Sequence, residues 1–161
     1  MTLIVQNKPL IIKDTREQRG FDFPEDDIFA GTVVEKLNYG DYSIQNLTHL
    51  IFIERKASTS EISKNVFEDR FTRLLENAKQ YKYRYIIMEF DWDDVINFPL
   101  NSGIPKHKQK YLKIKSAFLQ SYLTKISIDY GFHIVYAHNA ECAEKFTYNL
   151  LKNIWRKENA K

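Results

Sequence analysis

The sequence predicts an α/β fold in which a mixed central β-sheet is flanked by helices. In the first part of the chain, short runs rich in β-branched and aromatic residues are separated by turn residues, which is typical of strands. After residue 58 the apolar residues recur every three or four positions, as on the buried face of a helix. Two later apolar runs alternate with helical patterns and indicate further, parallel strands.

Four strands are expected in the first part of the chain, at residues 10–15, 32–37, 42–47 and 49–56. The clearest turn signal lies at residues 38–42, where a glycine follows Asn and Tyr. A single helix is expected to begin just after Lys56, with Ser58 or Thr59 as its cap. Its apolar stripe consists of Ile62, Val66, Phe67, Phe71, Leu74, Leu75 and Ala78.

The rest of the chain alternates strands with helices. Residues 84–90 are expected to form a buried parallel strand and residues 132–137 a last strand, while the proline- and glycine-containing segment 92–109 predicts a mobile loop. A second helical stripe stops before Gly131 and consists of Ile114, Phe118, Tyr122 and Ile126. The closing helix begins after its expected cap, Asn139, and its inward residues are Ala143, Phe146, Leu150, Leu151 and Ile154.

The length of 161 residues is that of one ordinary domain, so we expect a single domain over residues 1–161. The lone cysteine, Cys142, excludes an internal disulfide and is expected to be a buried, inert thiol. Because the N-terminus lacks a signal-peptide pattern and no apolar run reaches ~18 residues, we expect a cytoplasmic protein with no membrane partner. The net charge of +3 permits binding to a polyanion without requiring it.

Charged residues interrupt the predicted strands at two places. Asp41 follows the turn glycine, and an apolar strand ends in Glu54, Arg55 and Lys56. Hydrolysis of a phosphodiester uses a cation that polarises the phosphoryl oxygen, and hard cations such as Mg²⁺ prefer carboxylate oxygens. If the two strands form a hairpin, Asp41 and Glu54 come level and can reach one ion. The alternatives are an ordinary turn aspartate and a solvated strand end.

Lys56 shares a strand face with Glu54, because residues two apart on a strand point the same way. Its ammonium can orient the attacking water or offset negative charge that grows in the transition state. Arg55 points to the other face, where its side chain serves the structure or contacts a phosphate at the edge. Its backbone carbonyl is a further candidate ligand for the metal.

Three groups of residues, Asp14-Thr15-Arg16-Glu17, Gly40-Asp41 and Glu54-Arg55-Lys56, together resemble the signature of the ERCC4-type nuclease domain of the XPF family. The likeness extends from about residue 10 to residue 151, because the later helices and strands follow in the family's order. It implies a restriction-endonuclease-like core of the PD-(D/E)XK kind. It also implies cleavage of branched or flapped DNA that depends on Mg²⁺ or Mn²⁺.

The resemblance implies a role for each matching residue. Arg16 and Glu17 match residues that line the catalytic cleft, and Arg16 is a candidate contact to the scissile or adjacent phosphate. The alternative for Arg16 is a salt bridge to Glu17 or Glu54. The family's metal-binding acids match Asp14, Asp41 and Glu54, and its catalytic lysine matches Lys56.

One position departs from the family pattern. The family places an aspartate four residues after the lysine, where this chain has Ser60, with Glu61 beside it. A carboxylate one residue along a helix points in a different direction, so Glu61 is not expected to take that role. Because larger relatives also carry a tandem helix-hairpin-helix domain, we expect DNA to be held by the nuclease domain itself, by a homodimer or by a partner protein.

Other charged residues have less specific interpretations. Glu68, Asp69 and Arg70 are expected to form helix-surface pairs, and Glu89 is either a supporting acid near the site or a structural carboxylate. The densest positive run is expected to bind DNA phosphates beside the cleft, with a solvated helix face as the alternative. It consists of Lys106, Lys108, Lys110, Lys113 and Lys115.

The sequence therefore favours a metal-dependent DNA endonuclease acting in repair, recombination or replication. The alternative is a catalytically inactive nuclease fold that binds DNA or a partner subunit, which the serine at position 60 favours. A sequence-specific restriction-type nuclease would need a base-reading element, and no inserted domain is evident. The abundance of Lys, Asn, Ile and Tyr indicates an AT-rich bacterial or phage genome.

Overall fold

The computed structural model describes residues 7–160; residues 1–6 and 161, which the predicted domain included, lie outside them. Within the described residues six strands form one sheet in the order β2-β1-β3-β4-β5-β6. The strands are β1 Ile11–Lys13, β2 Thr32–Val34, β3 Tyr42–Ile44, β4 Ile51–Lys56, β5 Tyr83–Met88 and β6 His133–Tyr136. The helices are α1 Thr59–Asn65, α2 Asp69–Ala78, α3 Trp92–Ile96, α4 Lys106–Gln109, α5 Ser116–Tyr130 and α6 Ala140–Asn159.

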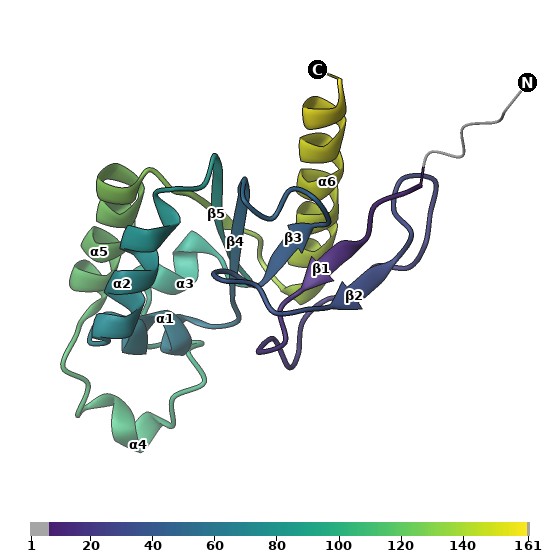
Figure 1. The fold of residues 1–161 in the computed structure, drawn as a ribbon. Coiled ribbons are helices and arrows are strands. Elements are labelled where there is room, and N and C mark those ends of the chain that lie inside the picture. Colours follow the sequence, from purple (N-terminus) through teal and green to yellow (C-terminus); the bar gives the residue numbers. More distant parts are fainter. Residues whose placement is uncertain (1–6, 161) are drawn as a thin grey trace, which may run out of the picture.

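The sheet is mixed, as the sequence predicted. Strand β3 runs antiparallel to both of its neighbours, β1 and β4. The outer pairs β1–β2, β4–β5 and β5–β6 are parallel. Helices lie on both sides of the strands in Figure 1, so the predicted α/β class is confirmed.

Two apolar clusters form the core, one on each face of the sheet. Phe52 of β4 and Ile86 of β5 belong to the cluster covered by α1, α2, α3 and α5. Ile53 and Ile87, the next residues along the same strands, belong to the cluster covered by α6 and by the segment around Phe21. Because side chains alternate along a strand, β4 presents its last residues to the two faces in turn. Figure 1 shows α6 apart from the other helices.

The helix expected after Lys56 is divided into two. Ser58 caps α1, since its hydroxyl accepts a hydrogen bond from the Glu61 N–H. The chain then leaves the helix at residues 66–68, and α2 begins afresh at Asp69. Val66 and Phe67 are weak helix formers, and an aspartate favours a helix start. Phe67 is exposed, so its predicted place in the buried stripe was wrong.

The segment 92–109 holds more structure than the predicted loop. Asp91 precedes α3, and its N–H donates to the carboxylate of Asp94, which helps to start this short helix. In α5 the buried residues are Leu119, Leu123 and Ile126, whereas Phe118 is exposed. Two apolar lines one residue apart run along this helix, and periodicity alone did not identify which one faces the core.

Helix α6 closes the other face of the sheet. The Asn139 side chain accepts a hydrogen bond from the Cys142 N–H at 2.8 Å, which confirms the predicted cap. Cys142 itself is exposed, because the helix turns Ala143 and Leu151 toward the sheet instead. The prediction of a buried thiol was therefore wrong. In residues 7–160 no helix combines the length and the apolar character needed to cross a membrane.

Replacing Asn139 by Ala should lower the free energy of unfolding by about 1 kcal/mol, because the first turn of α6 loses its side-chain cap. Urea denaturation followed by circular dichroism measures this change. Asn153→Ala is the matched control, because this exposed asparagine lies inside the same helix and should change stability by less than about 0.5 kcal/mol. Equal effects of the two substitutions would contradict the capping role.

Candidate active site

The β3–β4 hairpin brings the carboxylates of Asp41 and Glu54 level. Tyr42 pairs with Ile53 in the antiparallel register, so the preceding Asp41 lies opposite Glu54. The Asp41 N–H donates to the Ile53 carbonyl at 2.7 Å. Gly40 precedes it with φ +86°, and a Cβ there would lie 3.1 Å from that same carbonyl oxygen. A glycine is therefore needed where the turn passes close to β4.

Lys56 lies on the same face as Glu54. Its Nζ is 3.4 Å from Glu54 Oε1 and 3.6 Å from Glu61 Oε1. The ammonium also lies 4.8 Å from the centre of the Phe71 ring. Because the lysine is only 4% exposed, packing fixes its charged group beside the paired carboxylates.

The two carboxylates are close enough to affect each other's protonation. Burial raises the pKa of Asp41 well above its ordinary value, and the negative charge of Glu54 raises it further. Burial also raises the pKa of Glu54, although the Lys56 ammonium partly opposes this. A cation beside these oxygens would favour their charged forms.

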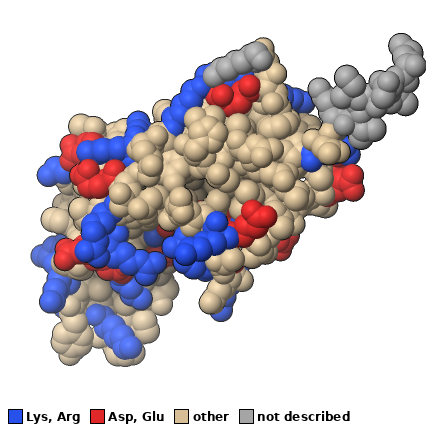
Figure 2. All heavy atoms as spheres, viewed as in Figure 1, with Lys and Arg blue, Asp and Glu red and all other residues tan. Residues whose placement is uncertain are grey.

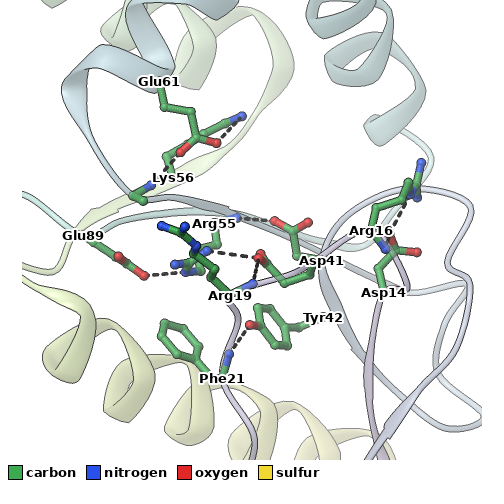
Figure 3. A network of polar contacts seen from close by, with 12 residues as sticks. Asp14, Arg16, Arg19, Phe21, Asp41, Tyr42, Arg55, Lys56, Glu61 and Glu89 are labelled. Carbon is green, nitrogen blue, oxygen red and sulfur yellow. Dashed lines mark hydrogen bonds and ion pairs between the residues drawn. The ribbon is translucent and has the colours of Figure 1, made fainter. Parts of the chain in front are cut away.

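Arg55 points to the opposite face, as expected. Its Nε pairs with Glu89, its Nη1 lies 3.2 Å from Glu17 Oε1, and its guanidinium lies over the Phe21 ring (Figure 3). The side chain is 12% exposed, and its two ion pairs and its ring contact give it a structural role. Its backbone N–H donates to Asp41 Oδ2 at 2.7 Å and thereby orients the catalytic candidate.

Asp14 lies next to Asp41, but both of its carboxylate oxygens accept hydrogen bonds from within the protein. Its Oδ1 accepts a hydrogen bond from Leu37 N–H at 2.7 Å, and its Oδ2 accepts one from Arg16 Nε at 2.6 Å. Burial works to raise the pKa of Asp14, but these hydrogen bonds outweigh it and lower the pKa overall. Figure 3 shows the Asp14–Arg16 pair beside Asp41.

The structure does not gather the three predicted metal-binding acids into one cluster. Across residues 7–160, no group of three or more Asp, Glu, His or Cys side chains is placed to hold a metal ion. Both Asp14 oxygens are bound within the protein, which leaves Asp41 and Glu54 as the candidate pair. The salt bridge of Arg16 is made with Asp14, not with Glu17 or Glu54 as the alternative supposed. The Arg16 side chain remains 54% exposed and open to a ligand.

These residues line a cleft of about 550 Å³ between the sheet and helices α1 and α2. One wall contains all seven residues that the sequence predicted, namely Asp14, Arg16, Glu17, Asp41, Glu54, Arg55 and Lys56. The other wall is formed by α1 and α2, from which Glu61, Asn65, Arg70, Phe71, Arg73 and Leu74 contribute. Most of this second wall was not predicted.

Glu61 is the clearest omission. Its carboxylate accepts a hydrogen bond from the Ala57 N–H at 2.9 Å and lies near Lys56 (Figure 3). Its long side chain in the first turn of α1 folds back over the helix start and so brings the carboxylate to Lys56. Arg70 was expected to form a surface ion pair, yet none is present among the described residues. The sequence feature that could have identified Arg70 as a cleft residue is its position on the polar face of α2.

The predicted DNA-binding lysines lie outside the cleft. Helix α4 projects beyond α1 in Figure 1, and none of the residues of this run lines the cleft. All of the run is exposed, and contact with DNA remains a prediction for Lys106, Lys108, Lys110, Lys113 and Lys115.

Fold and site together define an α/β domain with two half-buried carboxylates and a buried lysine beside the end of a central strand. The chain belongs to the ERCC4 domain family, whose model matches residues 14–150. No curated protein gives a significant sequence match.

Solved structures of XPF from Aeropyrum pernix share the fold. XPF from Aeropyrum pernix is 19% identical with a TM-score of 0.61, and the match covers 88% of this chain and 64% of that one. The structure of XPF from Aeropyrum pernix in complex with DNA is 20% identical with a TM-score of 0.62, covering 93% of this chain and 66% of that one. This chain therefore spans about two thirds of the XPF chains that it resembles.

Arg55→Met should lower the free energy of unfolding by roughly 3–5 kcal/mol, because Glu17 and Glu89 would lose the cation between them. Adding Glu17→Gln and Glu89→Gln should recover much of this loss by removing the unpaired charges. The measurement is urea denaturation, and Arg156→Met on exposed α6 surface is the control. A loss below about 1 kcal/mol for Arg55→Met would show that the pairs do not hold the hairpin.

Proposed function

We propose that this domain is a metal-dependent endodeoxyribonuclease that hydrolyses phosphodiester bonds in branched, flapped or junction DNA. The observation that carries the proposal is the half-buried pair of Asp41 and Glu54 beside the buried Lys56. Two neighbouring carboxylates that are largely withdrawn from water destabilise the fold unless a cation offsets them. Such an arrangement has a clear use in a catalytic site and little use in a structural one.

The residues present fit Mg²⁺ or Mn²⁺. Asp41 and Glu54 offer hard carboxylate oxygens; Oδ2 of Asp41 accepts a hydrogen bond from Arg55 N–H, and Oε1 of Glu54 pairs with Lys56. These two side chains would hold the ion, with the Arg55 carbonyl as a candidate third ligand. When bound, the ion would polarise the phosphoryl oxygen and lower the pKa of a water molecule.

The protein's own groups supply orientation and charge. Lys56 is held by two carboxylates and an aromatic ring, so its ammonium is ready to orient water or to offset charge on the phosphoryl group. Arg16 is half exposed and fixed through Asp14, which directs its guanidinium toward a phosphate in the cleft.

Membership of the ERCC4 domain family supports DNA as the substrate, and a similar fold is known in XPF in complex with DNA. The exposed lysines around α4 would add phosphate contacts beyond the cleft. The alternative of an inactive module relied on Ser60. Glu61 supplies a carboxylate near Lys56, which supports the active form.

Asp41→Asn and Lys56→Met should each lower cleavage at least about a hundredfold, because each removes a group fixed at the reacting phosphate. The assay is cleavage of labelled duplex, single-stranded, flap and Holliday-junction DNA with Mg²⁺ or Mn²⁺. Lys64→Met, which changes an exposed lysine of α1, should cleave as the wild type does. Binding without cleavage in every metal would identify an inactive module.

Asp41→Asn should also leave the protein at least as stable as the wild type at pH 7.5 in EDTA. A carboxyl whose pKa is raised in the folded state destabilises that state at pH values above its unfolded pKa, and asparagine removes the charge. Mg²⁺ should then raise the Tm of the wild type but not that of Asp41→Asn. Equal stabilisation of both proteins by Mg²⁺ would exclude Asp41 as a ligand.

A further inference from the structure

Helix α2 presents a positively charged face to the cleft. Arg70 and Arg73 are three residues apart, so they lie on one face of the helix, and both are exposed and line the cleft. Phe71 and Leu75 face the core. Neither arginine forms an ion pair within residues 7–160. In Figure 2, Lys and Arg side chains gather over the α2 end of the molecule, close to recessed Asp and Glu side chains.

A second observation lies beside these arginines. Asn65, the last residue of α1, also lines the cleft and is only 9% exposed. Its Oδ1 is buried and has no hydrogen-bond partner among the described residues. Buried polar groups are normally satisfied, and an orphan at a binding cleft indicates a partner supplied by a ligand. Leu74 of α2 and Tyr39, which lies in the turn just before Gly40, are half-buried and add apolar surface to the cleft.

We infer that this α1–α2 wall is a subsite that holds one DNA strand next to the bond to be cut. Arg70 and Arg73 bind consecutive phosphates of that strand, and the amide of Asn65 hydrogen-bonds the nucleotide between them. The inference rests on the proposed nuclease function. It names positioning residues for the substrate, in addition to the residues that act on the reacting phosphate.

The charge distribution supports this placement. A phosphate that enters the cleft is repelled by Asp41 and Glu54 on the sheet wall, and two unpaired guanidinium groups on the facing wall offset this repulsion. The cleft, at about 550 Å³, has room for part of one DNA strand. Tyr39 offers an aromatic face on which an unpaired base can stack.

The test is binding of a labelled flap substrate in EDTA at several salt concentrations. Arg70→Gln and Arg73→Gln should each lower the slope of log K against log salt by about 0.7, and the double variant should lower it by about 1.4. At 0.15 M salt each change corresponds to a roughly fourfold rise in Kd. Arg70→Lys should restore the slope. Arg156→Gln, an exposed arginine on α6, is the control and should leave it unchanged.

The variant Asn65→Ala tests the subsite independently of the two arginines. It should raise the Kd without lowering the Tm, because the lost side chain carries an unsatisfied buried oxygen. A lower Tm with unchanged Kd would make Asn65 structural and remove it from the subsite.

The outcomes separate the subsite from the nuclease activity. Unchanged salt slopes in both arginine variants, with DNA cleavage still abolished by Asp41→Asn, would overturn the subsite and leave the nuclease standing. Reduced slopes in a protein that cuts no DNA with any metal would support the subsite and overturn the proposed catalysis.

Discussion

The structure depends on a balance of charge at the end of β4. Asp41 and Glu54 lie half-buried side by side, which raises the free energy of the folded state. Lys56, beside Glu54, and the Arg55 backbone N–H, which donates to Asp41 Oδ2, hold these acids in place. The Arg55 side chain is itself fixed by Glu17 and Glu89. The catalytic candidates are thus held by a second set of ion pairs.

Strand geometry distributes these roles. Because alternate residues of β4 face opposite sides of the sheet, the side chains of Glu54 and Lys56 point into the cleft. The side chain of Arg55 points toward Phe21, in the apolar layer that α6 covers. Gly40 allows the preceding turn to approach β4 closely enough for Asp41 to take its place. A shift of one residue in the β3–β4 register would separate Asp41 from Glu54 and Lys56, which stay together because both belong to β4.

The alternation of side chains along a strand and the pairing of strands in a hairpin were enough to predict much of the site from the sequence. The level placement of Asp41 and Glu54 needed only a hairpin, and the opposite direction of Arg55 needed only alternation. Contacts between segments that are far apart in the sequence could not be predicted from these two features. The engagement of Asp14 by Leu37, the pairing of Arg55 with Glu89 and the cleft wall on α2 depend on packing across the sheet, which periodicity does not determine.

Phe71 connects the two walls of the cleft. Its ring lies beneath the Lys56 ammonium, and in α2 it stands between Arg70 and Arg73, with the cleft-lining arginines on either side in sequence. The same ring is part of the core cluster that anchors α2 on the sheet. The Phe71 ring that contacts the Lys56 ammonium therefore also belongs to the packing that holds the arginines of α2 on the facing wall. A cleft built in this way couples the position of the two arginines to that of the lysine.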